Sequence, residues 1–193
     1  MERRIVIGIT GASGVIYGIR MLEHLKGENF EKHLILSEAA KKNIQIETTY
    51  SVDEVCGLAD YVYSNSELTA PLASGSFLTD GMVIVPCTIK TLSGIANSYT
   101  NNLMIRAADV TLKEKRKLVL VVRETPLHKG HLQLMAAAAD LGAHILPPVP
   151  SFYHKPQTIE DILDQTIGKI FDYFTIGHNF FKRWAGEEMK GWD

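Results

Sequence analysis

A glycine-rich turn that carries a serine follows the first apolar run of the chain. Residues 8–18 read GITGASGVIYG, with Gly8, Gly11 and Gly14 three residues apart and Ser13 between the last two. Glycines let a backbone approach a ligand closely, and a helix that starts after such a turn offers free N–H groups to an anion. Ser13 could therefore bond a phosphate, a ring atom or a reacting group, or it could cap the helix. The spacing differs from G-x-G-x-x-G, so the nicotinamide fingerprint is not met.

Hydroxyl and charged side chains also follow the other apolar runs. These residues are Ser37 after the second run, Thr88, Lys90 and Thr91 after the third, and Arg123 with Glu124 after the fourth. The hydroxyls could cap helices, and the charged pair could be a surface ion pair. A cation is disfavoured at a helix N-terminus, so Lys90 indicates an anion nearby or a solvated side chain.

A densely charged segment, IRAADVTLKEKRK, adds further cations. Arg106, Asp109 and Lys113 recur at helical spacing and share a face, which could also be a solvated, salt-bridged surface. Tyr153 follows the last apolar run, and Glu47 ends a predicted helix. Together, these residues predict a basic, hydroxyl-rich set at one end of a sheet, which fits an anionic, phosphorylated ligand.

Other chemistries find little support in the sequence. The histidines are scattered without metal-ligand spacing, and His128 with His131 is interpreted as the start of a helix. Cys56 and Cys87 stand far apart and match no zinc or redox spacing. No G-x-S-x-G elbow indicates a serine hydrolase.

Apolar runs alternate with amphipathic stretches along the whole chain. We expect strands at 4–10, 33–37, 82–86, 117–123 and 143–146, and helices at 15–25, 38–47, 88–97, 103–115, 127–141 and 159–174. Residues 60–80 are polar and rich in turn formers. Strands that are apolar on both faces and separated by helices predict a parallel sheet covered on both sides. We therefore predict one doubly wound, three-layer α/β domain over residues 1–193, with ligands beyond the carboxyl ends of the strands.

Composition is that of an ordinary globular protein. The 193 residues are 46% hydrophobic and 22% charged, with a formal net charge of −2, so no strong field favours nucleic acid or an acidic membrane. The N-terminus MERRIVIG lacks a signal-peptide pattern, and no apolar run reaches the ~18 residues of a membrane span. The expected location is the cytoplasm.

Long, specific strings give the chain a resemblance to the UbiX-type flavin prenyltransferases. They include GITGASGVIYGIRML, SEAAKKNIQIE, MVIVPCTIKTLSGIAN, NLMIRAADVTLKEKRKLVLVVRETPLH and LPPVPSFYHKPQTIEDILD, and they cover nearly the whole chain. The resemblance implies a flavodoxin-like Rossmann domain, a dodecamer with sites at subunit junctions, and no metal. It implies transfer of a dimethylallyl group from dimethylallyl monophosphate to N5 and C6 of reduced FMN. The product, prenyl-FMN, is the cofactor of UbiD-type decarboxylases.

The resemblance also implies roles for individual residues. The flavin site should comprise Gly11, Ala12, Ser13, Ser37, Thr88, Ile89, Lys90, Thr91 and Arg123. Tyr153 and Lys169 should bind the prenyl phosphate, with positive charge added by Arg106, Lys113 and Arg123. Trp184 should stabilise a developing allylic cation through its π face. The base or relay for ring closure is left open among Glu47, Glu124, Ser13 and the departed phosphate. Lys169 replaces a frequent arginine, which keeps the charge but loses the bidentate fork.

Three alternatives stay open at this point. One is an FMN-dependent decarboxylase of the phosphopantothenoylcysteine decarboxylase type, whose catalytic histidine is replaced here by Glu47 in KKNIQIETT. Another is direct aromatic-acid decarboxylation. The third is a flavin carrier without catalysis, which would not need the cations expected on the phosphate side.

Overall fold

The computed structural model describes residues 3–184. The chain divides into two compact units, Met1–Pro148 and Val149–Asp193, which are described separately below. The first unit contains the whole sheet. That residues 1–193 behave as one domain stays a prediction.

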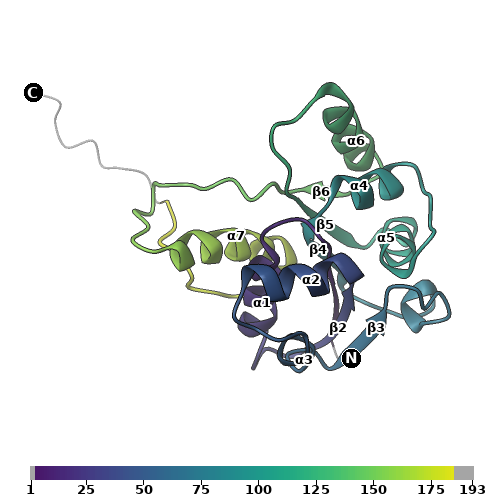
Figure 1. Cartoon of the computed structure of the whole chain (residues 1–193), viewed down its shortest axis with the longest axis horizontal. Helices are drawn as coiled ribbons and strands as arrows, with labels where there is room; N and C mark the ends of the chain where they lie inside the picture. The colour runs from purple at the N-terminus through teal and green to yellow at the C-terminus, as the bar shows by residue number, and fades with distance from the viewer. Residues whose placement is uncertain (1–2, 185–193) are drawn as a thin grey trace, which may run out of the picture. The chain divides into compact units, whose positions relative to one another are not determined.

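Six parallel strands form the sheet of the first unit, in the order β3-β2-β1-β4-β5-β6 (Figure 1). The strands are β1 (Arg3–Ile9), β2 (Phe30–Leu36), β3 (Tyr61–Ser64), β4 (Gly81–Cys87), β5 (Lys117–Val122) and β6 (His144–Ile145). Each neighbouring pair is parallel. The order reverses between β1 and β4, and in such sheets the ligand crevice opens outside the carboxyl ends at the reversal. The predicted parallel, doubly wound sheet is thus confirmed.

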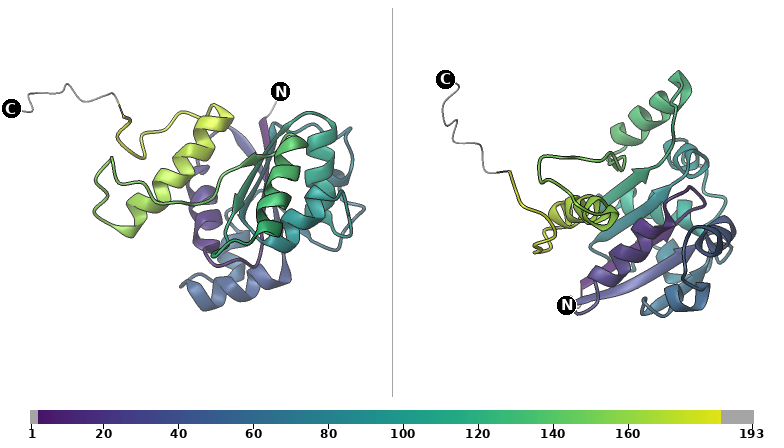
Figure 2. Two further views of the ribbon diagram at one scale, coloured as in Figure 1. Left: turned by 90° about the horizontal axis from the view of Figure 1, so that it is seen from above. Right: turned by 60° about the vertical axis from the view of Figure 1, so that its left-hand side comes forward.

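Helices of the first unit cover both faces of this sheet (Figure 2). They are α1 (Val15–His24), α2 (Glu38–Glu47), α3 (Val52–Cys56), α4 (Ile89–Ala96), α5 (Leu103–Lys113) and α6 (Lys129–Asp140), with a 3-10 turn at Pro71–Ala73. α1 lies very close to the sheet, since a Cβ added to Gly18 would meet the Val85 carbonyl oxygen at 2.5 Å. This approach fixes α1 directly behind the glycine turn that precedes it.

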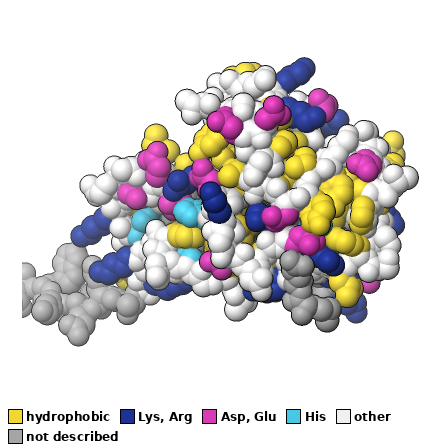
Figure 3. Space-filling view, turned by 90° about the horizontal axis from the view of Figure 1, so that it is seen from below, with side chains coloured by type: hydrophobic (Ala, Val, Ile, Leu, Met, Phe, Trp, Pro, Cys, Tyr) yellow, Lys and Arg dark blue, Asp and Glu magenta, His cyan; other side chains and the backbone are white. Residues whose placement is uncertain are grey.

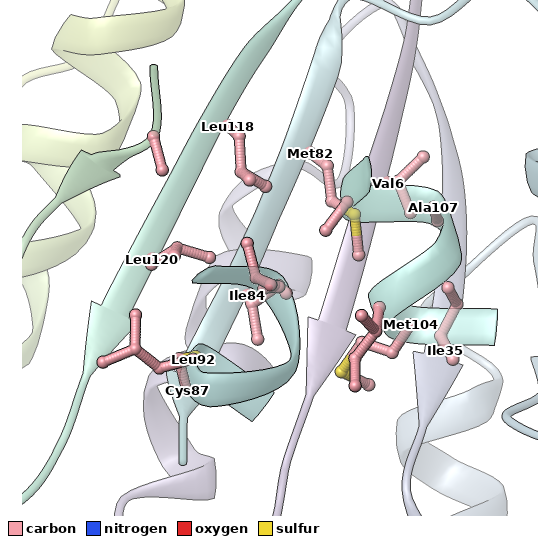
Figure 4. Close-up of a cluster of buried hydrophobic side chains, with 14 of the residues drawn as sticks. Val6, Ile35, Met82, Ile84, Cys87, Leu92, Met104, Ala107, Leu118 and Leu120 are labelled. Carbon is pink, nitrogen blue, oxygen red and sulfur yellow. The ribbon is translucent and has the colours of Figure 1, made fainter. Parts of the chain in front are cut away.

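The opposite face of the sheet packs against α4, α5 and α6. Alternate strand residues point into this layer, among them Val6, Met82, Ile84, Leu118 and Leu120 (Figure 4). They meet Leu92 from α4, Met104 and Ala107 from α5, and Ala138 from α6. Burial of a large aliphatic side chain contributes about 1.5–3 kcal/mol. The layer therefore holds α4 and α5, whose first residues border the crevice, in fixed places.

Two elements within the first unit differ from the sequence-based expectation. The short helix α3 was not predicted, although Ser51 and Glu54 form a capping box. The edge strand β3 falls inside the segment that was predicted to be turns. Its YVYS side chains are mostly exposed, so the strand lacks the apolar run by which the other strands are recognised.

In the second unit, α7 (Ile159–Phe174) is the only helix among the described residues. Thr158 and Asp161 cap its start reciprocally, and Thr175 ends it in the left-handed region. Asp172 accepts hydrogen bonds from Arg183 and is paired with His178, which fastens the segment after the helix to α7. The predicted bounds of this helix are confirmed.

Charge is mixed on the face shown in Figure 3. Lysine and arginine side chains there stand among aspartate and glutamate and do not form one basic field. Within residues 3–184, no helix is both long and apolar enough to cross a membrane.

Candidate functional site

A cavity of about 330 Å³ opens where the sheet order reverses. It is lined by Thr10 and Gly11 after β1, Ser37, Glu38 and Ala39 after β2, Asn65 after β3, Thr88, Lys90 and Thr91 after β4, and Asn102 with Ile105 at the start of α5. The structure therefore brings Gly11, Ser37, Thr88, Lys90 and Thr91 together around one cavity beyond the strand ends, and their binding of a ligand stays a prediction.

The glycine turn is held by three residues of α2. Gly11 packs so closely on Ala39 that an added Cβ would lie 2.3 Å from the Ala39 Cβ. The Asn43 amide donates to the Gly11 carbonyl oxygen at 3.0 Å, and Glu47 Oε2 accepts from the Gly14 N–H at 2.7 Å. The turn from Gly11 to Gly14 therefore contacts one side of α2 at both of its ends.

Ser13 does not cap α1. The N-cap is Gly14, with φ of 97° in the left-handed region and no side-chain cap bond. Glycine adopts this conformation without the penalty that other residues incur. The alternative in which Ser13 is a helix cap is therefore wrong, and its exposed hydroxyl is available to a ligand.

Thr10 joins the two loops that flank the reversal. Its Oγ1 donates to the Pro86 carbonyl oxygen at 2.7 Å and accepts from the Thr88 N–H at 2.9 Å. The glycine turn and the loop after β4 consequently hold a fixed relation to each other.

Two of the three helices that begin at the cavity are capped by hydroxyl side chains. Ser37 caps α2 by accepting from the Ala40 N–H, and Thr88 caps α4 by accepting from the Thr91 N–H. Both hydroxyls thus cap helices, which was one of the two interpretations of the sequence, and both residues also line the cavity. Helix N-termini carry partial positive charge and attract phosphate groups. Lys90, exposed in the first turn of α4, adds a full charge on the same side.

A second hollow adjoins this cavity. It measures about 410 Å³ and shares Lys90 and Ile105 with the first, while Ser93, Gly94, Asn97, Tyr99 and Asn101 complete its lining. The Ile89 side chain packs against the buried layer behind α4, and the predicted contact of this residue with flavin stays a prediction.

Arg123 and Glu124 lie at the end of β5, as predicted. The Arg123 N–H donates to the Cys87 carbonyl oxygen at 3.1 Å, and Glu124 accepts from the Thr125 N–H at 3.0 Å. Both side chains are exposed. They do not belong to the lining of the 330 Å³ cavity within one chain.

Arg106 and Lys113 are not brought to this cavity either. Arg106 donates to the Ala73 carbonyl oxygen and pairs with Asp109 at 3.0 Å. Lys113 pairs with Glu114 at the C-terminal end of α5, about 15 Å along the helix from the end that borders the cavity. The expectation that all the cations gather at one end of one sheet is therefore wrong for Lys113, because α5 runs away from that end.

Three predicted substrate residues belong to the second unit. Tyr153 and Trp184 are exposed, with ring centroids 6.3 Å apart. The Lys169 ammonium lies 5.7 Å from the centroid of the Phe181 ring. Beside Tyr153, both ring nitrogens of His154 are buried and have no hydrogen-bond partner within the described residues. The roles of Tyr153, Lys169 and Trp184 stay predictions.

Several cavity residues were missed by sequence reasoning. Asn65 accepts from the Leu103 and Met104 N–H groups, and Asn102 caps α5. An asparagine before an apolar helical stretch is a usable cap signal. By contrast, the contacts of Ala39 and Asn43 with the turn depend on how α2 packs and leave no local signal.

A larger hollow of about 520 Å³ lies at the opposite end of the strands. Its walls include Lys32 and Asp60, which pair with each other at 2.9 Å. Ligands bind such sheets at the carboxyl ends, so this hollow is not the candidate site. Among residues 3–184, no group of three or more metal-ligating side chains is found.

Sequence comparison identifies close relatives of the chain. A family model described as Flavoprotein matches residues 1–177. The flavin prenyltransferase UbiX of Thauera aromatica is 54% identical over 187 residues, which cover 97% of this chain and 96% of the relative. UbiX of Escherichia coli K12 is 52% identical, with coverage of 95% and 99%.

Solved structures agree with these relatives. A crystal structure of AnUbiX (PadA1) in complex with FMN and dimethylallyl pyrophosphate superposes with a TM-score of 0.95 at 47% identity, covering 97% of this chain and all of that one. A dodecameric FMN-dependent UbiX-like decarboxylase from Escherichia coli O157:H7 gives 0.93 at 43%, with coverage of 95% and 100%. The peptidyl-cysteine decarboxylase EpiD, at 18% identity and a TM-score of 0.60, shares the fold alone.

Proposed function

This chain belongs to the UbiX-type flavin prenyltransferases, within the Flavoprotein family, and we propose that it transfers a dimethylallyl group from dimethylallyl monophosphate to N5 and C6 of reduced FMN. The product is prenyl-FMN. The observation that carries the proposal is the near full-length identity of 52–54% to UbiX enzymes, joined to a cavity of the right chemistry at the sheet reversal.

The residues of the cavity fit FMN. Gly11 lines the cavity, and its lack of a Cβ lets α2 pack directly on the turn through Ala39, which holds the turn at the edge of the cavity. The N-termini of α2 and α4, with Ser37, Thr88 and Lys90, suit the phosphate group. We propose that Gly11, Ala12, Ser13, Ser37, Thr88, Ile89, Lys90, Thr91 and Arg123 hold the flavin.

The reduced flavin supplies nucleophilic N5 and C6. The chain's task is to help the allyl–oxygen bond break, which builds negative charge on the phosphate. We propose that the side chains of Arg106, Lys113, Arg123 and Lys169 stabilise this negative charge and that the Tyr153 hydroxyl donates a hydrogen bond to the phosphate. Preorganised groups of this kind typically contribute about 3–4 kcal/mol each to a transition state.

A positive charge develops on the prenyl carbon at the same time. The π face of Trp184 suits it, and an apolar wall protects it from water. Ring closure releases a proton, for which Glu47, Glu124 and Ser13 are the acceptors or relays within the chain. Glu47 is well placed relative to the turn, because it already touches Gly14.

The distance between the cavity and Lys113 is explained if the site is shared. We propose a homo-oligomer, a dodecamer like the Escherichia coli O157:H7 relative, in which one subunit supplies the cavity and another supplies Arg106 and Lys113. The product would pass to a UbiD-type decarboxylase in the cytoplasm. Neither nucleic acid nor a membrane has a part in this proposal.

An anaerobic assay tests the function directly. The protein is incubated with reduced FMN and dimethylallyl monophosphate, and the flavin is analysed by mass spectrometry. We expect the flavin to gain the mass of one dimethylallyl unit. Unchanged flavin, together with CO₂ release from a hydroxybenzoate or a cysteinyl substrate, would instead support a decarboxylase.

A further inference from the structure

Three residues on one face of α2 hold the glycine turn. Ala39, Asn43 and Glu47 stand four residues apart, which places them above one another on one side of the helix. Ala39 packs on Gly11, Asn43 donates to the Gly11 carbonyl oxygen, and Glu47 accepts from the Gly14 N–H. The first contact sets the spacing between helix and turn, and the other two fix the two ends of the turn.

The bond from Asn43 sets the direction of one peptide group. In a planar trans peptide, the N–H points opposite to the C=O. Because the Gly11 carbonyl points toward Asn43, the N–H of Ala12 points away from α2. Ala12 is buried, and within residues 3–184 its N–H makes no hydrogen bond. A backbone N–H without an acceptor in the chain is a donor that suits a ligand atom.

We propose that Asn43 is a positioning residue of the flavin site, which holds the Gly11–Gly14 turn so that the Ala12 N–H and Ser13 face the ligand. This inference rests on the proposed function, since it takes FMN to be that ligand. Asn43 touches neither reactant itself and acts through the turn. Removing its donor leaves the Gly11 peptide free to rotate, and the cost appears when FMN must order the turn again.

A matched pair of substitutions tests the role. Asn43→Asp and Gln45→Glu make the same amide-to-carboxylate change two residues apart on α2, and Gln45 is exposed. FMN is titrated into flavin-free protein, followed by quenching of flavin fluorescence. We expect Asn43→Asp to raise the FMN Kd roughly tenfold, since one hydrogen bond becomes a repulsion, and Gln45→Glu to change it less than about twofold. Equal Kd values for the two variants would overturn the proposal.

A double-mutant cycle separates positioning from general loss of structure. Asn43→Ala and Glu47→Ala both release the same turn, so their effects on the FMN Kd should not multiply: the double variant should bind at least about threefold more tightly than the product of the single effects predicts. Effects that multiply, or a lower Tm with unchanged FMN binding, would refute the role. Asn43→Ser serves in the same way if Asn43→Asp does not fold. These titrations contain no prenyl donor, so they test FMN binding alone. If the protein binds FMN but makes no product in the separate prenylation assay, the proposed function is refuted and the binding test remains valid.

Discussion

Glu47 is a side chain with two roles available to it. One carboxylate oxygen accepts from the Gly14 N–H at 2.7 Å and so helps to hold the glycine turn. The other oxygen is left for the proton released on ring closure. Substitution by glutamine keeps an acceptor for Gly14 and removes the proton acceptor, so it separates the two roles.

We expect Glu47→Gln to bind FMN with a Kd within about threefold of the wild type and to form product about 100-fold more slowly, which is the usual contribution of a general base. Flavin fluorescence measures the binding, and the absorbance change of the product measures the rate. Wild-type turnover by the variant would show that Glu47 is not the base. A large loss of FMN affinity would show that its main role is to hold the turn.

At this scale, the sequence predicts a residue's place when the residue follows a buried strand. Ser37 and Thr88 were located in this way, because parallel strands all end at one edge. The rule fails for Asn43, which lies inside a helix and meets Gly11 only through tertiary packing. It also fails for Lys113, whose helix begins at that edge and ends far from it.

Among the elements, the edge strand β3 depends on a buried histidine of β2. His33 stacks on Tyr61 at 4.9 Å, bonds the Tyr63 hydroxyl at 2.9 Å, and contacts Glu31 through its other nitrogen at 2.7 Å. Arg4 pairs with Glu31 and lies over the Phe77 ring. The exposed YVYS segment therefore pairs as a strand with β2, where Tyr61 and Tyr63 contact His33.

The charges in this cluster make stability depend on pH. Burial lowers the pKa of His33 and outweighs the hydrogen bond that His33 makes to Glu31, which raises it. Desolvation raises the pKa of Glu31, but hydrogen bonds from His33 and Arg4 outweigh it and leave that pKa below its usual value. Both groups bind protons more readily in the unfolded chain. Ionised Glu31 therefore favours folding at neutral pH, neutral His33 adds nothing there, and protonation of either group disfavours the folded state in acid.

We expect the free energy of unfolding to fall as pH drops below about 6.5, where histidine in the unfolded chain becomes protonated, and to fall further below the usual range of glutamate. Denaturant titrations of the wild type and His33→Gln between pH 7.5 and 4 measure this, because the variant lacks the first decline. Parallel profiles for the two proteins would exclude His33 as the cause.

The predictability of elements follows the same logic. Strands β1, β4 and β5 were foreseen because they are buried on both faces and therefore apolar throughout. β3 was not foreseen, since it is short and exposed and its contacts with His33 come from another strand.

For the whole molecule, the position of the cationic side chains indicates how many subunits build one site. The cavity lies at the carboxyl ends of the strands, whereas Lys113 closes α5 at its far end. If Lys113 stabilises the leaving phosphate, it does so in the site of another subunit. If each site takes residues from two subunits, mixed oligomers of two inactive variants can regain activity, provided that each variant alters a different subunit's contribution to the site.

We expect Ser13→Ala and Lys113→Ala each to lose most activity as a pure protein. Co-expression of the two should place intact halves together in about a quarter of the sites of a randomly mixed oligomer. Product formation by the co-purified mixture, compared with the two pure variants mixed without exchange, measures this. No recovery in verified mixed oligomers would place Lys113 in the same chain's site or outside the site.

Residue types and strand order predict a cavity for an anion where the sheet order reverses, but they do not predict the reaction. Ser37, Thr88 and Lys90 suit any phosphorylated ligand, so they do not name the reaction. The reaction follows from the resemblance to UbiX enzymes, which the 52–54% identity over nearly the whole chain bears out.

The contact between Gly11 and Ala39 restricts how this site can evolve. A Cβ on Gly11 would lie 2.3 Å from the one on Ala39, so position 11 cannot enlarge while alanine stands at 39. An alanine at 11 becomes tolerable only after a glycine has appeared at 39, which makes the order of the two substitutions matter. Descendants of this sequence should therefore keep glycine at position 11 for as long as alanine stands at position 39.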